Sequence, residues 1–230
     1  MKKSLIALTL AACSSLAIAE DAVKTLETKE QKVSYGFGLM LGKRMGNDLP
    51  ELNMDSFVQG VRDAFAGNAQ LMTDAEVAQL LSDYQREQQE KHMEKVREQS
   101  EANKKAGEDF LAANKNKEGV VTLESGLQYK VIAEGKGIQP GPTDKVKVHY
   151  TGSLISGEVF DSSVERGQPV TFPVNGVISG WTEALQLMPS GSKWQLFIPS
   201  ELAYGATGNR SIGPNETLLF DVELIEVIKQ

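Results

Sequence analysis

The chain has 230 residues, 40% of them hydrophobic, and a mean hydropathy of -0.27. This composition is typical of globular proteins, and the length suffices for one large domain or two ordinary ones. The formal net charge of -7 argues against binding to nucleic acid or to an anionic membrane surface, because both partners require clustered Lys and Arg. We therefore expect no nucleic-acid partner.

The N-terminus has the features of a secretory signal peptide. Two lysines follow Met1, an apolar stretch covers residues 5–18, and Ala17 and Ala19 provide the small residues of a cleavage site. The apolar stretch is too short to span a bilayer comfortably. We predict that residues 1–19 are a signal peptide and that the mature protein is periplasmic.

A second interpretation of this segment remains open. The sequence Leu10–Ala11–Ala12–Cys13 resembles a lipoprotein cleavage box, which would leave a lipid on Cys13 and associate the protein with the outer membrane. Cys13 is the only cysteine, so a chain cleaved after Ala19 could form no disulfide, which suits a bacterial periplasm. The remaining sequence has no long apolar run, and we expect no membrane span there.

The distribution of three residue types marks a domain boundary near residue 125. Seven of the eight prolines, both tryptophans and 13 of the 21 glycines lie after this position. Before it, over residues 29–117, apolar residues recur at the three- and four-residue spacing of helices. After it, apolar and polar residues alternate as in strands. The sequence therefore predicts an α+β protein with an all-helical N-terminal half.

The helical half begins with two short apolar helices. The second starts at Asn53 as N-cap and stops at Gly67. The apolar stripes are Val33, Phe37, Met40 and Leu41 in the first helix, and Phe57, Val61, Ala64 and Phe65 in the second. Since little else covers these stripes, we predict that residues 20–72 form a homodimer with a second copy. A monomeric three-helix bundle is the alternative.

A third, much longer helix follows. Thr73 and Glu76 form a capping box at its start, and a helix from residue 74 to about residue 114 would be roughly 60 Å long. It is polar on every side between residues 85 and 105, which is typical of a solvent-exposed spacer. We assign residues 73–115 to a long connecting helix and residues 116–125 to a linker.

Residues 126–230 have the pattern of a small β-rich domain. Apolar and polar residues alternate over residues 145–150, 193–198 and 218–224, and Gly and Pro separate these segments. One short amphipathic segment, residues 180–188, is typical of a helix. We expect a strongly bent antiparallel β-sheet wrapped on a short helix.

Five segments of this domain resemble, in order and approximate spacing, the signature stretches of the FKBP family of peptidyl-prolyl isomerases. They are Val148–Gly152, Phe160–Ser163, Val177–Trp181, Ala203–Gly205 and Leu218–Leu224. After its signal segment, the chain is similar as a whole to the exported FKBP group that includes the macrophage infectivity potentiator. The resemblance implies an isomerase with chaperone activity that acts on proline-containing polypeptides and assists the folding of exported proteins. It also implies that macrolide inhibitors such as rapamycin bind.

The same resemblance implies roles for nine residues. The prolyl pocket would be lined by Tyr150, Phe160, Val177, Ile178, Trp181 and Phe220. Asp161 would lie beside the reacting amide, paired with Arg166. The Tyr204 hydroxyl and the Ile178 backbone N–H would donate hydrogen bonds to substrate carbonyls. We therefore expect Asp161, Tyr204 and Ile178 to be catalytic and the other six residues to bind substrate.

Such a site needs no cofactor. Rotation about an X-Pro bond faces a barrier of about 18–20 kcal/mol because the twisted amide loses resonance, and an apolar pocket with a few placed donors lowers this barrier without covalent chemistry. With two histidines and no acidic cluster at ligand spacing, we expect no metal site. The alternative function is a non-catalytic holdase or adhesin that uses the fold as a scaffold. The presence of Tyr150, Asp161, Trp181 and Tyr204 favours catalysis.

Overall fold

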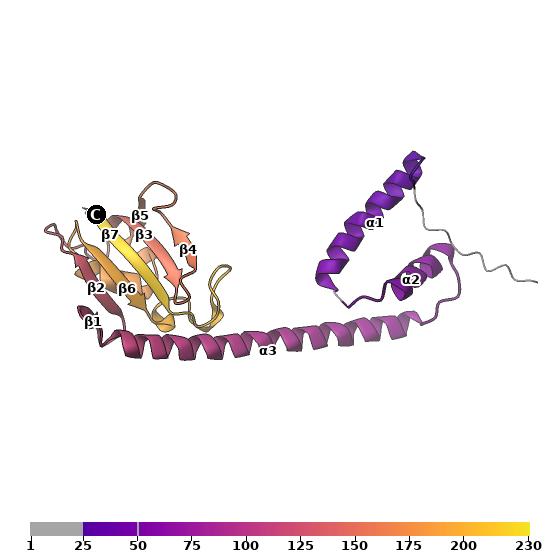
Figure 1. Cartoon of the computed structure of the whole chain (residues 1–230), viewed down its shortest axis with the longest axis horizontal. Helices are drawn as coiled ribbons and strands as arrows, with labels where there is room; N and C mark the ends of the chain where they lie inside the picture. The colour runs from indigo at the N-terminus through magenta and orange to yellow at the C-terminus, as the bar shows by residue number, and fades with distance from the viewer. Residues whose placement is uncertain (1–24, 50) are drawn as a thin grey trace, which may run out of the picture. The chain divides into compact units, whose positions relative to one another are not determined.

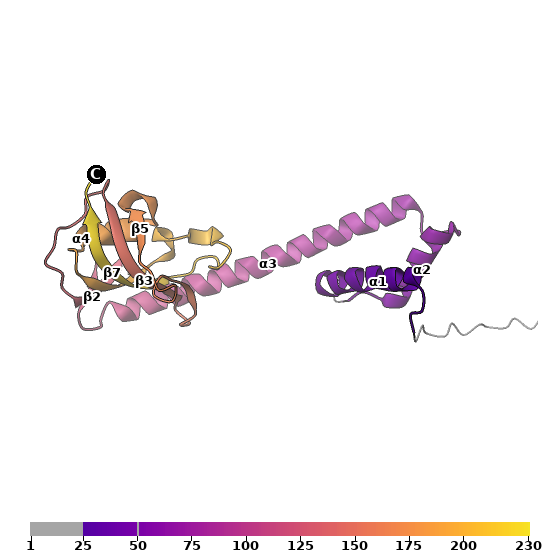
Figure 2. The same ribbon diagram turned by 90° about the horizontal axis from the view of Figure 1, so that it is seen from above.

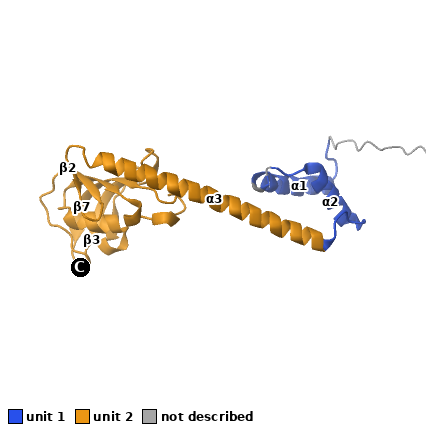
Figure 3. Ribbon diagram, turned by 90° about the horizontal axis from the view of Figure 1, so that it is seen from below, with its two compact units in different colours: residues 1–74 blue, residues 75–230 orange. Residues whose placement is uncertain are grey.

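The computed structural model of the chain describes residues 25–49 and 51–230. The predicted signal peptide and Cys13 lie outside these residues. The chain divides into two compact units, residues 1–74 (unit 1) and residues 75–230 (unit 2), shown in Figure 3. Within the described residues, no helix combines the length and apolar character needed to cross a membrane.

Unit 1 contains two helices whose ends are set by local capping. α1 (Lys29–Asp48) starts after Thr28, which forms a capping box with a glutamine of the first turn. α2 (Met54–Ala66) starts after Asn53, whose side chain accepts a hydrogen bond from a backbone N–H of the first turn. It ends at Gly67, which adopts the left-handed conformation with φ 66°. Both ends of α2 are those predicted from the sequence.

The apolar side chains of α1 and α2 are largely exposed within a single chain. Phe37 is 64% exposed and Phe65 is 94% exposed. Every buried apolar side chain among the described residues lies in unit 2, from Leu127 to Leu224. Among the described residues, unit 1 therefore has no buried apolar core of its own.

Unit 2 begins at the second residue of α3 (Asp74–Asn114), an unbroken helix of 41 residues, as the sequence predicted. Its last turns run beside the β-sheet (Figures 1 and 2), and two of their residues, Gly107 and Asn114, are buried. The Asn114 amide donates to the Gln128 side chain at 3.0 Å, and the Gln128 amide donates to the Leu111 carbonyl at 2.9 Å. The end of this helix, beyond the polar stretch 85–105 for which the sequence predicted a solvent-exposed spacer, is therefore docked on the sheet.

Seven antiparallel strands form one sheet in unit 2. They are β1 (Val120–Thr122), β2 (Gln128–Ala133), β3 (Lys145–Leu154), β4 (Val159–Ser162), β5 (Val170–Pro173), β6 (Lys193–Ile198) and β7 (Leu218–Ile228). Their order is β1-β2-β6-β7-β3-β4, and β5 pairs with the first half of β3. With the single short helix α4 (Ser179–Leu187) packed into the core, this sheet confirms the α+β class. Strand β1 lies within residues 116–125, where the sequence predicted a linker.

The hydrophobic core lies between α4 and one face of the sheet. Its strand residues are the alternating ones that the sequence pattern indicated: Val146, Val148 and Tyr150 of β3, Trp194, Leu196 and Ile198 of β6, and Leu218, Phe220, Val222 and Leu224 of β7. Phe197 departs from the alternation, because it is buried although it points to the opposite face of β6. The ring of Phe110 from α3 lies 5.9 Å from it, centroid to centroid. The docked end of α3 thus covers an apolar residue that the sheet alone would expose.

Candidate active site

The strands β3, β4, β5 and β7 and the start of α4 enclose a pocket of about 460 Å³. Eight of the nine predicted site residues line it: Tyr150, Phe160, Asp161, Val177, Ile178, Trp181, Tyr204 and Phe220. The ninth, Arg166, is ion-paired with Asp161. The structure therefore brings together all nine residues from five separate segments of the chain.

Trp181 is the centre of an aromatic cluster. Its ring meets those of Tyr150, Phe172 and Phe220 edge to face, at centroid distances of 5.3, 6.0 and 5.2 Å. Phe160 meets Phe220 in the same way at 5.5 Å. Edge-to-face contacts are favourable because the positive edge of one ring faces the negative face of another. Since each ring is held by its neighbours, the cluster presents a preformed apolar surface.

Gly152 of β3 makes room for two of these rings. A Cβ atom at this position would lie 2.6 Å from Phe220 Cε1 and 2.7 Å from Phe160 Cε2. Both distances are well inside the ordinary carbon–carbon separation of about 3.5–4.0 Å. Any larger residue would have to displace a ring that lines the pocket.

One wall of the pocket is polar. The Tyr150 hydroxyl donates to Asp161 Oδ2 at 2.5 Å, and Arg166 Nη1 donates to Asp161 Oδ1. Arg166 Nη2 also donates to the Tyr150 hydroxyl oxygen at 3.0 Å, and its guanidinium lies 5.7 Å from the centre of the Tyr150 ring. Both carboxylate oxygens of Asp161 are therefore held, and hydrogen bonds to a charged acceptor are the stronger kind.

These contacts shift the pKa values of the three residues. Burial raises the pKa of Asp161, but the hydrogen bonds from Tyr150 and Arg166 outweigh it, so this pKa lies below its ordinary value. Burial, reinforced by the hydrogen bond to Asp161, raises the pKa of Tyr150. The hydrogen bond to Asp161 is the main cause of the raised pKa of Arg166. At neutral pH the wall therefore carries an ionised carboxylate, a guanidinium and a neutral phenol.

Two further predicted residues lie at the edge of the pocket. Ile178 immediately precedes α4, and its carbonyl accepts hydrogen bonds from the N–H groups of Trp181 and Thr182 at 2.9 and 3.0 Å. Over residues 25–49 and 51–230, the Ile178 N–H donates to no backbone carbonyl. Tyr204 is 41% exposed and lies between η2 (Ser200–Leu202) and η3 (Gly205–Thr207).

The sequence-based prediction did not include three lining residues, Phe172, Gly176 and Ala203. Phe172 lies on β5, opposite Val146 of β3, and belongs to none of the five signature stretches. The available signal was the alternation of Val170 and Phe172 in a short segment. Ala203 lies within a signature stretch, but it was given no role.

The lining is suited to a reaction in which no covalent bond is made or broken. It combines an apolar floor with one ionised carboxylate, and its eleven residues include no serine, cysteine or histidine. Such a surface removes water from a bound group while holding fixed charges beside it. Within the described part of the chain, no three His, Cys, Asp or Glu residues are grouped so as to hold a metal ion.

Comparisons with known proteins agree with this chemistry. Residues 30–131 match the family model described as the domain amino terminal to FKBP-type peptidyl-prolyl isomerase. Residues 136–225 match the model described as FKBP-type peptidyl-prolyl cis-trans isomerase. Together the two matches cover most of the chain.

Curated relatives and a solved structure extend the match over both parts. The outer membrane protein MIP of Legionella longbeachae is 45% identical over 216 residues, covering 94% of this chain and 93% of the relative. The FKBP-type 22 kDa peptidyl-prolyl cis-trans isomerase of Escherichia coli K12 is 48% identical over 206 residues, covering 89% and 98%. The crystal structure of FkpA from Escherichia coli has a TM-score of 0.75 and 38% identity, covering 89% of this chain and 99% of that one.

The chain therefore belongs to the FKBP-type peptidyl-prolyl cis-trans isomerase family, and its activity is the isomerisation of X-Pro bonds. Because it carries both the amino-terminal and the isomerase parts, it falls with the Mip and FkpA proteins of that family.

Proposed function

We propose that the prolyl ring of a polypeptide substrate binds over Trp181, with the reacting amide beside Asp161. The observation that carries this proposal is the polar wall of Tyr150, Asp161 and Arg166 directly beside the aromatic cluster. The side chains of Phe160, Val177 and Phe220 hold the ring by apolar contact. The N–H of Ile178 and the Tyr204 hydroxyl donate to the substrate carbonyls.

This arrangement favours the twisted amide over the planar one. Water stabilises the planar, more polar amide, so transfer to an apolar floor removes part of that preference. The Asp161 carboxylate is ionised and fixed before substrate arrives, so its field costs no reorganisation when the amide rotates. Each 1.36 kcal/mol of differential stabilisation accelerates rotation about tenfold.

The test uses the full mature chain and short peptides with one X-Pro bond. We expect micromolar protein to accelerate cis-to-trans conversion, and rapamycin to abolish the acceleration by filling the pocket. A Trp181→Ala variant should lose most of the activity, because the floor of the pocket is removed. An accelerated rate that rapamycin and Trp181→Ala both leave unchanged would place the activity outside this pocket.

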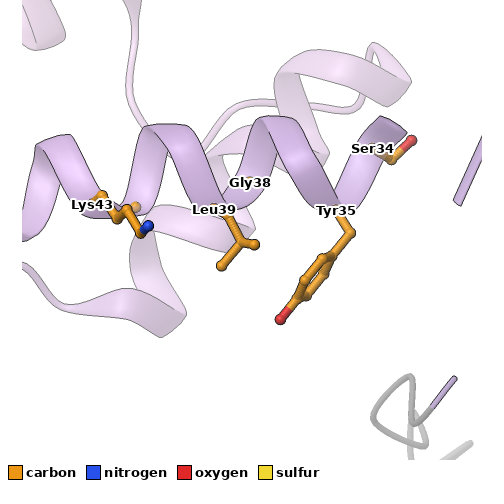
Figure 4. A pocket seen from close by; sticks show the side chains of 6 residues that line it. Ser34, Tyr35, Gly38, Leu39 and Lys43 are labelled. Atoms are coloured by element: carbon orange, nitrogen blue, oxygen red, sulfur yellow. The ribbon is translucent and has the colours of Figure 1, made fainter. Parts of the chain in front are cut away.

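We also infer that residues 20–72 form a homodimer, with residues 73–115 as the connecting helix. Support comes from the exposure of the apolar stripes of α1 and α2. On α1, Tyr35 and Leu39 project beside Gly38 (Figure 4) and line a shallow hollow that continues to Gly42. A second helix seated over these glycines would bury both side chains.

The cellular role follows from the predicted export. With residues 1–19 removed by cleavage, the protein acts in the periplasm on proline-containing clients that have just been exported. Two isomerase domains in one dimer hold a long client at a raised effective concentration, which supports chaperone activity. The test is refolding of a proline-limited protein by the dimer and by a monomeric variant at equal site concentration. We expect the dimer to be faster, and equal rates would refute the chaperone role.

A further inference from the structure

One face of α3 approaches the segment that carries Tyr204. We call residues 203–217 the rim loop. Toward the C-terminal end of α3, residues of reduced exposure recur at positions 96, 100, 103, 107 and 110, whereas their neighbours 97–99, 101, 102 and 104–106 are exposed. This spacing of three and four residues is that of a single helix face.

Polar side chains of this face hold two consecutive residues of the rim loop. The side-chain amide of Asn103 donates to the Pro214 carbonyl at 2.8 Å. The side-chain amide of Asn215 donates to Ser100 Oγ at 2.8 Å. One turn further along α3, Gly107 lies so close to the loop that a Cβ atom there would overlap Thr217 Oγ1 and lie 3.2 Å from Thr217 Cβ.

The part of the rim loop that contacts α3 is hydrogen-bonded directly to the part that lines the pocket. The backbone N–H of Asn215 donates to the Gly205 carbonyl at 2.8 Å, and the N–H of Gly208 donates to the Tyr204 carbonyl at 3.3 Å. Ser100 is therefore connected through Asn215 to Gly205, which is the residue next to Tyr204. Since Ala203 and Tyr204 both line the pocket, a shift of Asn215 moves part of the pocket edge.

The conformation of Asn215 strengthens this connection. With φ 54°, it is the one non-glycine residue in the left-handed region among the described residues, and Asn is one of the few residues that tolerate this region. In this conformation its backbone N–H points to Gly205 while its side chain reaches Ser100. One residue thus fixes both the fold of the loop and its attachment to α3.

Apolar packing anchors the rim loop at Ile212, which is buried in the core, and at Ala203, which packs against the core, but not at Ala206. Ala206 is exposed and borders an open, shallow hollow shared with Val96 and Arg97 of α3. The hydrogen bonds that join Ser100 to Asn215 and Asn103 to Pro214 are polar contacts that attach the rim loop to α3.

We propose that Ser100 and Asn103 are positioning residues for isomerisation, which hold the rim loop so that Tyr204 faces the bound substrate. The proposal rests on the isomerase function and on the role proposed for Tyr204. Both residues lie outside the segment 136–225 that matches the isomerase family model. Trp181 and Asp161 belong to α4 and β4, so the aromatic cluster and the polar wall stay intact when the hydrogen bonds between α3 and the rim loop are lost. The role proposed for Tyr204 is to hold a substrate carbonyl rather than to act on the rotating amide, so we expect KM to rise while kcat is nearly unchanged.

The experiment compares the full chain with Ser100→Ala, Asn103→Ala and the double variant in X-Pro peptide isomerisation. Alanine has the higher helix propensity at both positions, so these changes remove hydrogen bonds without weakening α3. We expect the double variant to raise KM by about threefold to tenfold with kcat within about twofold, the pattern of lost binding rather than lost chemistry. Lys104→Ala, on the exposed side of α3, is the matched control and should behave as wild type.

A double-mutant cycle tests whether Ser100 acts through Asn215. Asn215→Gly removes the side-chain amide but keeps the left-handed backbone, because glycine adopts positive φ freely. Ser100→Ala and Asn215→Gly should each raise KM, and together they should raise it no further than the larger single effect. Ser100→Thr, which keeps the hydroxyl, should retain wild-type KM, and amide exchange over residues 205–215 should quicken only in the variants that lose the hydrogen bonds between α3 and the rim loop.

The outcomes separate this inference from the isomerase function itself. If the wild-type chain does not catalyse isomerisation, the isomerase function fails first. If the wild type is active but the double variant keeps its KM, the positioning role is refuted. The positioning role is also refuted if Lys104→Ala raises KM as much as the double variant does. It is refuted as well if the double variant lowers kcat together with the unfolding temperature of unit 2, because that pattern indicates a purely structural role.

Discussion

The side-chain amide of Asn103 on α3 donates a 2.8 Å hydrogen bond to the carbonyl of Pro214, 111 residues later in the chain. This contact joins the part that matches the amino-terminal family model to the part that matches the isomerase model. The two parts therefore do not meet at a simple linker. The last turns of α3 pack as an integral element of the isomerase unit, which is how the chain divides into compact units.

Asp161→Ala should lower kcat/KM by about tenfold or more, equal to about 1.4 kcal/mol of transition-state stabilisation. The reason is that an ionised carboxylate, fixed by Tyr150 and Arg166, is lost from beside the amide. Asp161→Asn keeps the shape but not the charge, so a similar loss there assigns the effect to charge. Glu165→Ala, an exposed carboxylate on the same loop, is the control. Unchanged kinetics in a folded Asp161→Ala protein would reduce Asp161 to a structural partner of Arg166.

Gly107→Ala should weaken the docking of α3 although alanine is the better helix former by about 1 kcal/mol. The added Cβ overlaps Thr217 Oγ1, and Thr217 is buried with little room to move. We expect a lower unfolding temperature of unit 2, measured through the fluorescence of Trp181 and Trp194. Thr217→Ala in the same chain should restore it, because the overlapping oxygen is gone. A single Gly107→Ala variant more stable than wild type would show that the close approach is not required.

The contact between Lys229 and Asp144 should make the free energy of unfolding depend on pH in the acidic range. The hydrogen bond from Lys229 Nζ, followed by that from the Gly141 N–H, lowers the pKa of Asp144 below its ordinary value. A carboxyl with a lowered folded pKa contributes stability that is present above the unfolded pKa of about 3.9 and is lost as the pH falls through the folded value.

Urea unfolding of wild type and Asp144→Asn at a series of pH values measures this contribution. The free energy of unfolding should fall more steeply between about pH 5 and pH 2 in the wild type than in the variant. Glu134→Gln, which removes an exposed carboxylate elsewhere, should follow the wild-type curve. Parallel curves for wild type and Asp144→Asn would mean that the contact with Lys229 contributes nothing to the free energy of unfolding.

Phe57→Asp together with Phe65→Asp should dissociate the dimer, because a carboxylate buried at a subunit contact has no partner and its desolvation is costly. Phe65 is 94% exposed within one chain, so the substitution does not disturb the packing of that chain. Sedimentation should give a monomer, while kcat/KM on short peptides stays at the wild-type value because the pocket lies in unit 2. If the protein remains a dimer with both substitutions, the subunit contact does not depend on α2.

The fold was predictable where hydrophobic periodicity carries the information. The ends of α2, the unbroken α3 and the alternation along β3, β6 and β7 all follow from apolar spacing and capping residues. Eight of the eleven lining residues were predictable because the five signature stretches resemble those from which the family builds its site. Periodicity could not show that the end of α3 is docked, since Ser100, Asn103 and Gly107 make the contact through polar groups and close backbone approach. Because the docked end of α3 also carries Phe110, a fragment of the chain that began at residue 116 would lack this ring and leave Phe197 uncovered.

Isomerisation at this pocket is tested most directly by exchange NMR on a peptide with one X-Pro bond, in the presence of a catalytic amount of the full mature chain. An isomerase site in this pocket predicts exchange cross-peaks between the cis and trans forms on a timescale of seconds or less, whereas the uncatalysed bond takes tens to hundreds of seconds. It also predicts that a Trp181→Ala, Asp161→Ala double variant removes those cross-peaks. Cis and trans signals that exchange no faster with the wild-type chain than without it would contradict the assignment of an isomerase site to this pocket.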